Sequence, residues 1–452
     1  MYKRQGEAWI AVGLLIGTIL NWYIVSARLR KYTIVAGNSL TIPSFFKNRY
    51  RDHKNIIKIV SASIIAVFFT VYTASAFSSG AKLFATLFSN SASGDENYNQ
   101  VYVIGLIVAA VVILVYTFMG GFKAVCTTDL IQGLMMIVAI LSVPVLAYAI
   151  LTFDTSFSSA LAAKGVEQPA QFLNFFVNGD GTPVSAVSII SNLAWGLGYF
   201  GMPHILVRFM AVKSNEEIKK SRKIAVVWVI ISLTASCLIG LIARGYLTAQ
   251  LDDATSESVF IRTIQQIFSG NGVLIFIGGI FLCGILAAIM STADSQLLVT
   301  ASAVSEDLYK GAVKKNASEK SSLLVGKIAV AVVAVIAFFI ALNPKSSIMG
   351  LVSDAWAGFG SAFGPVVLLA LFWKRSTLSG AISGMATGAL TVIIWDYIPL
   401  VNGQTLYAAT NLYSLVVGFG LALIVNVIVS LLSKKPSKEI MDEFDSIKNI
   451  EV

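Results

Sequence analysis

The stretch Trp195-Gly196-Leu197-Gly198-Tyr199-Phe200-Gly201-Met202-Pro203-His204 decides the fold of this chain, because it interrupts an apolar segment long enough to cross a bilayer. Its three glycines and its proline weaken a helix. In hydrocarbon, a backbone group freed by such a break is costly unless it faces a protein cavity. Secondary transporters use broken helices at mid-depth to present carbonyls and helix ends to substrates and ions. With aromatic rings and a histidine beside the break, the stretch predicts a site for a small organic solute.

The composition of the whole chain indicates a polytopic membrane protein. Of its 452 residues, 56% are hydrophobic and 13% are charged, and the mean hydropathy is +0.78. Soluble domains carry roughly 25% charged residues. Apolar runs of about 20 residues, the length of a membrane-spanning helix, recur about eleven times. We expect these spans near residues 8–25, 57–83, 101–119, 124–152, 186–209, 223–247, 271–294, 323–343, 347–373, 378–397 and 409–433.

The net charge of +9 reflects membrane topology, not a nucleic-acid surface. Most of the 33 lysines and arginines fall in alternate loops, and the positive-inside rule places such loops in the cytoplasm. The intervening loops 88–100 and 250–258 are acidic and fit the outer face. We therefore predict a multi-pass plasma-membrane protein with residue 1 outside, a cytoplasmic C-terminus and a short cytoplasmic tail over residues 434–452. A short interfacial helix is expected within the basic loop 26–56.

The broken span at 186–209 divides the chain into two groups of helices. Four predicted spans precede it, five run from it to residue 373, and two follow. Inverted-repeat transporters commonly pair two five-helix halves, each opened by a broken helix. We therefore predict an all-α transmembrane domain over 1–433 with a five-plus-five inverted-repeat core. Residues 186–373 would form its second repeat, and 8–152 an incomplete first repeat that lacks the opening helix.

Several function classes lack their signatures in this sequence. Cys126, Cys237 and Cys283 lie in predicted spans, so no disulfide framework is implied. Two histidines and three scattered cysteines make no metal site, and no nucleophile–base pair or phosphate loop is present, so we do not expect an enzyme. We expect His204 to be a structural hydrogen-bonding group. A membrane sensor domain is an alternative class. The short tail after residue 433 argues against it, because it leaves no room for a signalling domain.

Blocks distributed along the chain resemble the sodium:solute symporter family. In chain order they are Trp9–Leu14, Phe68–Tyr72, Tyr116–Phe122, Trp195–Ala211, Ala287–Thr292, Glu306–Tyr309 and Ala355–Gly360. The resemblance covers essentially the whole chain. It implies a leucine-transporter-like fold, proline as the solute, sodium as the coupling ion and transport by alternating access. It also implies two further spans ahead of residue 8, the second of which would open the core.

The adjacent hydroxyls of Ser291 and Thr292 lie deep in an apolar span and leave two interpretations open. Sodium prefers hard oxygen ligands, whereas hydroxyls in membrane helices often bond back to a carbonyl one turn earlier. The resemblance implies a sodium site here, with the Ala288 carbonyl and carbonyls of the absent helix as further ligands. Asp129, near the start of span 124–152, is either a helix N-terminal acid or, by the resemblance, a group in the sodium exit path.

The aromatic residues beside the break form a candidate solute site. Trp195, Tyr199 and Pro203 are spaced four apart and would share one face of an α-helix. Ring faces can contact the compact ring of proline and attract its secondary ammonium, while helix-end amides suit its carboxylate. Aromatic residues at helical spacing also commonly pack a core. The resemblance implies that these three residues bind proline together with Gly198 and Tyr72.

The sequence leaves some alternatives within this reading open. The same fold with another small solute, such as pantothenate or a sugar, would present similar patterns. A fragment without activity is a further alternative, since the helix count predicts a missing helix. The expected partners are proline, the sodium ion and membrane lipid, with neither a nucleic acid nor an obligate protein partner.

Overall fold

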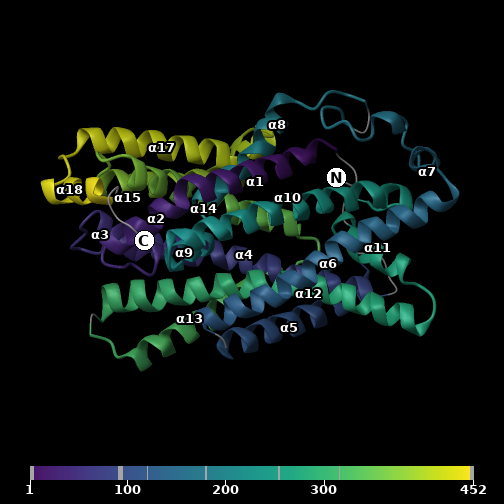
Figure 1. Cartoon of the computed structure of the whole chain (residues 1–452), viewed down its shortest axis with the longest axis horizontal. Helices are drawn as coiled ribbons and strands as arrows, with labels where there is room; N and C mark the ends of the chain where they lie inside the picture. The colour runs from purple at the N-terminus through teal and green to yellow at the C-terminus, as the bar shows by residue number, and fades with distance from the viewer. Residues whose placement is uncertain are drawn as a thin grey trace.

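The computed structural model describes residues 5–89, 95–119, 121–178, 181–252, 255–314 and 316–447, and these residues are predominantly helical. Residue 1 and Val452, whose sides of the membrane are predicted above, lie outside the described residues. The long helices run side by side as one bundle (Figure 1). Its first helices are α1 (Ala8–Leu20), α2 (Ser26–Val35), α3 (Ile42–Arg49), α4 (Ile56–Phe88), α5 (Glu96–Met119), α6 (Phe122–Asp154) and α7 (Phe157–Ala163).

The second part of the bundle begins with the broken span, in which η4 (Ala194–Phe200) joins two short helices. The helices of this part are α8 (Ala186–Leu193), α9 (Pro203–Ala211), α10 (Asn215–Tyr246), α11 (Val259–Ile267), α12 (Gly272–Ser302), α13 (Glu319–Ala341), α14 (Ile348–Phe372), α15 (Leu378–Tyr397), α16 (Leu406–Thr410), α17 (Ser414–Leu432) and α18 (Lys438–Ser446). A small hairpin of β1 (Pro399–Val401) and β2 (Gln404–Thr405) precedes α16. Short 3-10 turns lie at η1 (Gln5–Glu7), η3 (Pro169–Gln171) and η5 (Ser256–Ser258).

The number of membrane-crossing elements agrees with the prediction. Among the described residues, ten helices are long and apolar enough to cross a membrane, and Ala186–Phe200 is a shorter apolar helix. With the broken span, these account for the predicted total of about eleven. Two helices extend further than expected, through the π-helical turns η2 (Asn21–Val25) and η6 (Ala303–Val313). Hydropathy marks only the part of a helix within hydrocarbon, so polar extensions such as Ser26–Val35 escape it.

The two ends of the bundle carry different short elements. Helices α3 and α18 lie at one end, and α7 and α11 lie at the other (Figure 1). Helix α3 is the short helix expected in the loop 26–56. Thr41 caps it by accepting a hydrogen bond from the Ser44 amide at 3.2 Å, and Pro43 occupies its first turn, where a missing N–H costs nothing.

Helix α14 is the central column of the bundle. In its membrane-crossing part, 83% of the residues are buried, whereas the other spanning helices of the described chain have at most 44% buried. Its glycines allow close approach, because a Cβ added at Gly358 or Gly364 would lie 2.1 Å from Phe68 or 2.5 Å from Phe419. Small residues thus let α4 and α17 pack directly on α14, and the broken segment rests on the same column.

Candidate functional site

The predicted break in the fifth span is present. Helix α8 ends at Leu193, a 3-10 turn follows over Ala194–Phe200, and α9 starts with Pro203 as its first residue. In a continuous α-helix the Tyr199 carbonyl would accept from the amide of residue 203, but proline has no N–H. The break therefore follows from the local sequence, and it leaves carbonyls that other elements must satisfy.

Two side chains from distant elements bond to carbonyls of this segment. Asn21 Nδ2 donates to the Tyr199 carbonyl at 3.0 Å, and Trp356 Nε1 donates to the Trp195 carbonyl at 2.7 Å. Asn21 begins the π-helical turn η2 beside α1, and Trp356 lies on α14. The role of Asn21 was not predicted from the sequence, although a single polar amide within an apolar run often indicates a functional contact inside the bundle. Trp356 was noticed only as part of a family block.

Aromatic rings surround the segment. The Trp195 ring stacks on Tyr413 with centroids 5.4 Å apart and on Trp356 at 6.1 Å, while Tyr199 meets Trp356 edge-on at 5.1 Å. Tyr72 of α4 packs against the same buried cluster. Trp356 and Tyr413 therefore join the predicted residues Trp195, Tyr199 and Tyr72 in one aromatic site.

The predicted shared face of Trp195, Tyr199 and Pro203 requires an α-helix, and that condition is not met. A 3-10 turn has 3.0 residues per turn, so residues four apart point about 120° apart. Trp195 and Tyr199 instead both contact the indole ring of Trp356, which projects from α14 toward the segment. Pro203 instead lines a cavity on the other side of the break.

Glycines of the segment serve close packing. A Cβ at Gly198 would lie 1.9 Å from Trp356 Nε1, and one at Gly201 would lie 2.2 Å from the Phe359 carbonyl on α14. The segment approaches α1 equally closely at Gly196, where an added Cβ would lie 2.2 Å from the Gly13 carbonyl. The predicted site residue Gly198 thus admits the indole of Trp356 to the broken segment.

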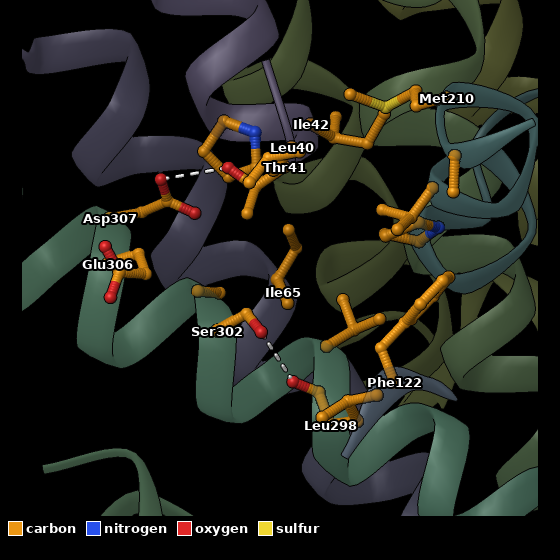
Figure 2. A pocket seen from close by; sticks show the side chains of 16 residues that line it. Leu40, Thr41, Ile42, Ile65, Phe122, Met210, Leu298, Ser302, Glu306 and Asp307 are labelled. Atoms are coloured by element: carbon orange, nitrogen blue, oxygen red, sulfur yellow. Dashed lines mark hydrogen bonds between the residues drawn. The ribbon is translucent and has the colours of Figure 1, made fainter. Parts of the chain in front are cut away.

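The segment lies between two cavities. One, of about 930 Å³, is lined by Trp195 and Tyr413 together with polar residues such as Ser191 and Asn192. The other, of about 330 Å³, is bounded by Pro203 and by the residues shown in Figure 2, including Ile65, Met210, Leu298 and Asp307. The two cavities approach the break from opposite sides.

Polar groups close one end of the smaller cavity. In Figure 2, Thr41 points at Asp307 and donates to its Oδ1 at 3.0 Å. Ser44 donates to the same oxygen at 2.9 Å, and Lys58 Nζ lies 3.1 Å from it. Asp307 is fully buried, so this ion pair ties α3 and α4 to η6 where solvent screening is weak.

The predicted sodium ligands lie together on α12. Ser291 Oγ and Thr292 Oγ1 both donate to the Ala288 carbonyl, at 3.2 and 3.0 Å. This is the back-bonding arrangement that the sequence left as an alternative. It also gathers three oxygens within a small volume. No group of three or more His, Cys, Asp or Glu side chains suited to a metal occurs in the part of the chain that the structure describes.

Asp129 does not cap its helix. Helix α6 begins at Phe122, so Asp129 lies about two turns inside it. Its Oδ2 accepts from Arg208 of α9 at 2.5 Å, and Arg208 also donates to Ser295 Oγ at 2.8 Å. The helix-terminus interpretation is therefore wrong, because an ion pair with α9 holds this carboxylate. Asp294, next to Ser295, is fully buried.

Two smaller expectations have clear outcomes. The three cysteines are free. The ring of His204 lies 5.8 Å from that of Phe69, and its Nδ1 has no hydrogen-bond partner within the described ranges. The Phe69 ring packs beside this imidazole, and a hydrogen-bonding role for its other nitrogen stays a prediction.

Comparison with known proteins identifies the family. The profile of the sodium:solute symporter family matches residues 5–388. A curated sodium/proline symporter of Staphylococcus aureus is 41% identical over 450 residues, which cover 98% of this chain and 82% of that protein. The corresponding protein of Staphylococcus aureus strain Newman matches to the same extent.

Solved structures share the fold. One, described as a substrate-bound, outward-open Na⁺-coupled sialic acid symporter, aligns with a TM-score of 0.64 at 17% identity, over 96% of this chain and 91% of that one. A second is Mhp1, a nucleobase-cation-symport-1 family transporter in a closed conformation, with a TM-score of 0.50 at 14% identity over 98% and 89% of the two chains. The chain therefore belongs to the sodium:solute symporter family, a family of multi-pass membrane transporters and not of enzymes.

Proposed function

We propose that this protein is a sodium-coupled symporter that carries proline into the cell by alternating access. The observation that carries the proposal is the broken segment between two cavities, with Trp195 lining one and Pro203 the other. A solute held at the break is reached from each side in turn when the helices around it shift. The 41% identity to proteins named sodium/proline symporter supports both the ion and the solute.

We assign the aromatic site to proline. Trp195, Tyr199 and Tyr72 offer ring faces to its apolar ring and its ammonium. Gly198 admits Trp356 to the segment, and Pro203 is the first residue of α9, whose N-terminal end suits a carboxylate. The stacked rings around Trp195 support this assignment, because they give a small ring a rigid wall.

We assign sodium to the oxygens of Ser291, Thr292 and Ala288. Both hydroxyls converge on the Ala288 carbonyl, so a cation would gain three oxygens when the hydroxyl hydrogens rotate away. Because sodium is a hard cation, other elements would have to supply the remaining oxygens. The Na⁺ gradient drives uptake when bound sodium favours the outward-facing, solute-competent state.

Asp129 belongs, in this proposal, to the path by which sodium leaves. Its carboxylate lies on α6, and Arg208 of α9 neutralises it. A cation that passes this point competes with Arg208 for the carboxylate. Because α9 is also the helix that begins at Pro203, the ion pair links the exit path to the broken segment.

We propose that the end of the bundle with α3 and α18 faces the cytoplasm. The loop 26–56 at this end is rich in Lys and Arg, and Lys434, Lys435 and Lys438 directly follow the last span, as the positive-inside rule requires. The larger cavity then opens outward and the smaller one inward. Residues 186–373 form the second inverted repeat, 8–152 belong to the first, and α15 and α17 lie outside the core.

Uptake into proteoliposomes tests the function. The full chain is reconstituted, and radiolabelled proline is supplied with an inward sodium gradient. We expect accumulation that falls to background when potassium or choline replaces sodium. Uptake that persists in choline would contradict sodium coupling. Sodium-dependent uptake of labelled pantothenate or a labelled sugar, but not of labelled proline, would contradict the assigned solute.

A further inference from the structure

A second polar cavity, which the proposed transport function does not use, adjoins the smaller cavity. Its volume is about 390 Å³, and Glu306 lies in the walls of both cavities. Basic side chains from several elements converge on it, and we call it the basic cavity: Lys47 of α3, His53 of the next loop, Lys58 of α4 and Lys310 of η6. A cleft lined by charges of one sign attracts ions of the other sign.

Two of the three lysines have a carboxylate partner, and the third does not. Lys58 Nζ lies 3.1 Å from Asp307 Oδ1, and Lys310 Nζ lies 2.9 Å from Glu306 Oε1. None of the ion pairs found among the described residues involves Lys47. The basic cavity therefore keeps an unbalanced positive charge. That balance suits a ligand with a single negative charge and several acceptor oxygens.

The basic cavity lies at the boundary of the membrane-spanning region, at the end of the bundle that carries α3 (Figure 1). One span begins at Ile56, directly after Asn55 in the cavity wall, and another ends at Gly311, which is also in the wall. Ile56 and Ile59 share a face of α4 and are both exposed. Phospholipid headgroups lie just outside the hydrocarbon, and basic pockets between spanning helices bind them.

The N-terminal end of α4 is not itself the binding feature, because a carboxylate already caps it. Asp52 accepts from the Ile57 amide at 2.8 Å and from the Lys54 amide at 3.0 Å. The Asn55 side chain donates to the Gly311 carbonyl at 2.7 Å and so ties the loop to η6. This bond holds the walls of the basic cavity together, and the lysine ammonium groups are left as the donors to a ligand.

We propose that the basic cavity binds the phosphate group of an anionic phospholipid, with Lys47 supplying the unbalanced charge. A phosphodiester such as that of phosphatidylglycerol carries a single negative charge and several acceptor oxygens, which match the lysine donors. The inference goes beyond the proposed function and does not depend on the identity of the transported solute. Because Lys58 also holds Asp307, the lipid phosphate lies beside the ion pair that joins α3 and α4 to η6.

Chemical labelling of individual lysine amines tests the proposal. The purified full chain is placed in nanodiscs of phosphatidylcholine, of phosphatidylcholine with phosphatidylglycerol, or of phosphatidylcholine with inorganic phosphate in the buffer. Each sample receives a limiting amount of an amine-acetylating reagent, and mass spectrometry gives the labelling rates of Lys47, Lys310 and Lys219. Lys219 is the internal control, because it is an exposed lysine of α10 outside the basic cavity.

We expect phosphatidylglycerol to slow the labelling of Lys47 and Lys310 by at least about fivefold relative to Lys219, the range for a lysine that contacts an anionic lipid. In Lys47→Gln, which breaks no ion pair, protection of Lys310 should require about fivefold more phosphatidylglycerol. Lys47→Arg keeps the charge and should keep the protection. Lys219→Gln removes the same charge elsewhere and should leave the protection unchanged.

The outcomes that overturn the proposal are distinct. Equal protection of Lys47 and Lys219 would show general attraction to a charged bilayer and no defined site. Protection by inorganic phosphate but not by phosphatidylglycerol would overturn the lipid as the source of the phosphate group. Labelling rates that are the same in all three samples would exclude a phosphate site altogether. Unchanged protection of Lys310 in Lys47→Gln would overturn the role assigned to Lys47.

Discussion

Single side chains replace the backbone hydrogen bonds that the broken helix loses. Pro203 offers no N–H to the Tyr199 carbonyl, and the Asn21 amide supplies the bond at 3.0 Å. The Trp356 indole donates similarly to the Trp195 carbonyl. In a membrane an unsatisfied carbonyl is costly, so each of these donors stabilises the break at the point where a solute would bind.

The hydroxyls of Ser291 and Thr292 give a prediction at the same scale. Ser291→Ala or Thr292→Ala should raise the sodium concentration for half-maximal proline uptake. Loss of one oxygen ligand should cost about 1–3 kcal/mol, or roughly 5- to 150-fold in affinity. Proteoliposome uptake against sodium concentration measures the change.

Thr300→Val is the matched control for these variants. Thr300 is buried on the same helix and bonds back to the Gln296 carbonyl at 2.8 Å, as Ser291 and Thr292 do to Ala288. Its variant should keep the sodium dependence of the unaltered protein. If the Ser291 and Thr292 variants behave like this control, back-bonding is the whole role of the two hydroxyls.

At the scale of elements, the broken segment depends on its contact with α14. The close approach at Gly198 and Gly201 leaves no room for a methyl group, and the neighbour at Gly201 is backbone. A backbone neighbour cannot rotate away, so α14 or the segment would have to shift. The aromatic site depends on the same contact, because Trp356 lies on α14.

Gly201→Ala should therefore destabilise the protein by about 1–3 kcal/mol, the usual cost of overpacking. Gly279→Ala on α12 is the control, since an added Cβ there meets nothing within 4 Å. It should be neutral or stabilising by about 0.5–1 kcal/mol through helix propensity. Thermal unfolding of both variants in detergent measures the difference. Equal melting temperatures for the two variants would show that the contact with α14 is not tight.

At the scale of the whole molecule, ion pairs fix α4 near both of its ends. Lys58 pairs with Asp307 of η6 at 3.1 Å, and Lys82 pairs with Glu257 of η5 at 2.6 Å. Lys82 also donates to the Ser346 carbonyl just before α14. Helix α4, which carries Tyr72, is thus held at each end of the bundle by elements from the second part of the chain.

The Lys82–Glu257 pair predicts a dependence of stability on pH. Burial raises the pKa of Glu257, but the hydrogen bond and charge of Lys82, with hydrogen bonds from the Met349 amide and the Ser347 hydroxyl, together outweigh this and hold the pKa below the ordinary 4.5. Because folding lowers this pKa, the stabilisation is complete above pH 4.5 and is lost as pH falls through the lowered value. Melting temperatures measured from neutral pH into this acidic window should fall accordingly.

Glu257→Gln should lower stability at neutral pH by about 1–3 kcal/mol and remove part of the acid-induced loss. Glu439→Gln is the control, because the Glu439 side chain is 74% exposed in its pair with Arg51. An exposed pair contributes little, so this variant should match the unaltered protein. Identical pH profiles for Glu257→Gln and the unaltered chain would exclude a role for the pair.

The number of crossings predicts the sidedness of the loops. Between residues 95 and 215 the chain contains α5, α6 and the broken span, so reporter fusions after these residues should lie on opposite sides of the membrane. A fusion after residue 155, which follows α6, should lie on the same side as residue 95. Fusions at 95 and 215 on the same side would mean that the broken span does not cross.

Much of the architecture could be predicted from the sequence because its causes are local. Hydropathy alone located the spans, since about 20 apolar residues must lie in hydrocarbon wherever they occur. The position of the break followed from Pro203 together with the glycines just before it, since a missing N–H and flexible glycines in one short stretch weaken a helix. Side-chain type alone made the hydroxyl pair Ser291 and Thr292 and the aromatic residues of the break candidates, and the family resemblance implied their roles.

Only the tertiary structure decided which side chains meet at the break. Asn21 lies 178 residues before Tyr199 and Trp356 lies 161 residues after Trp195, so no local pattern pairs them. The 3-10 form of Ala194–Phe200, which turns Pro203 away from the rings, depends on close contact with α1 and α14. The Asp129–Arg208 pair likewise depends on how α6 and α9 pack. The spans and the break follow from local chemistry. The partners of each carbonyl and charge follow from packing between helices that are distant in the sequence, and no short stretch of the sequence determines that packing.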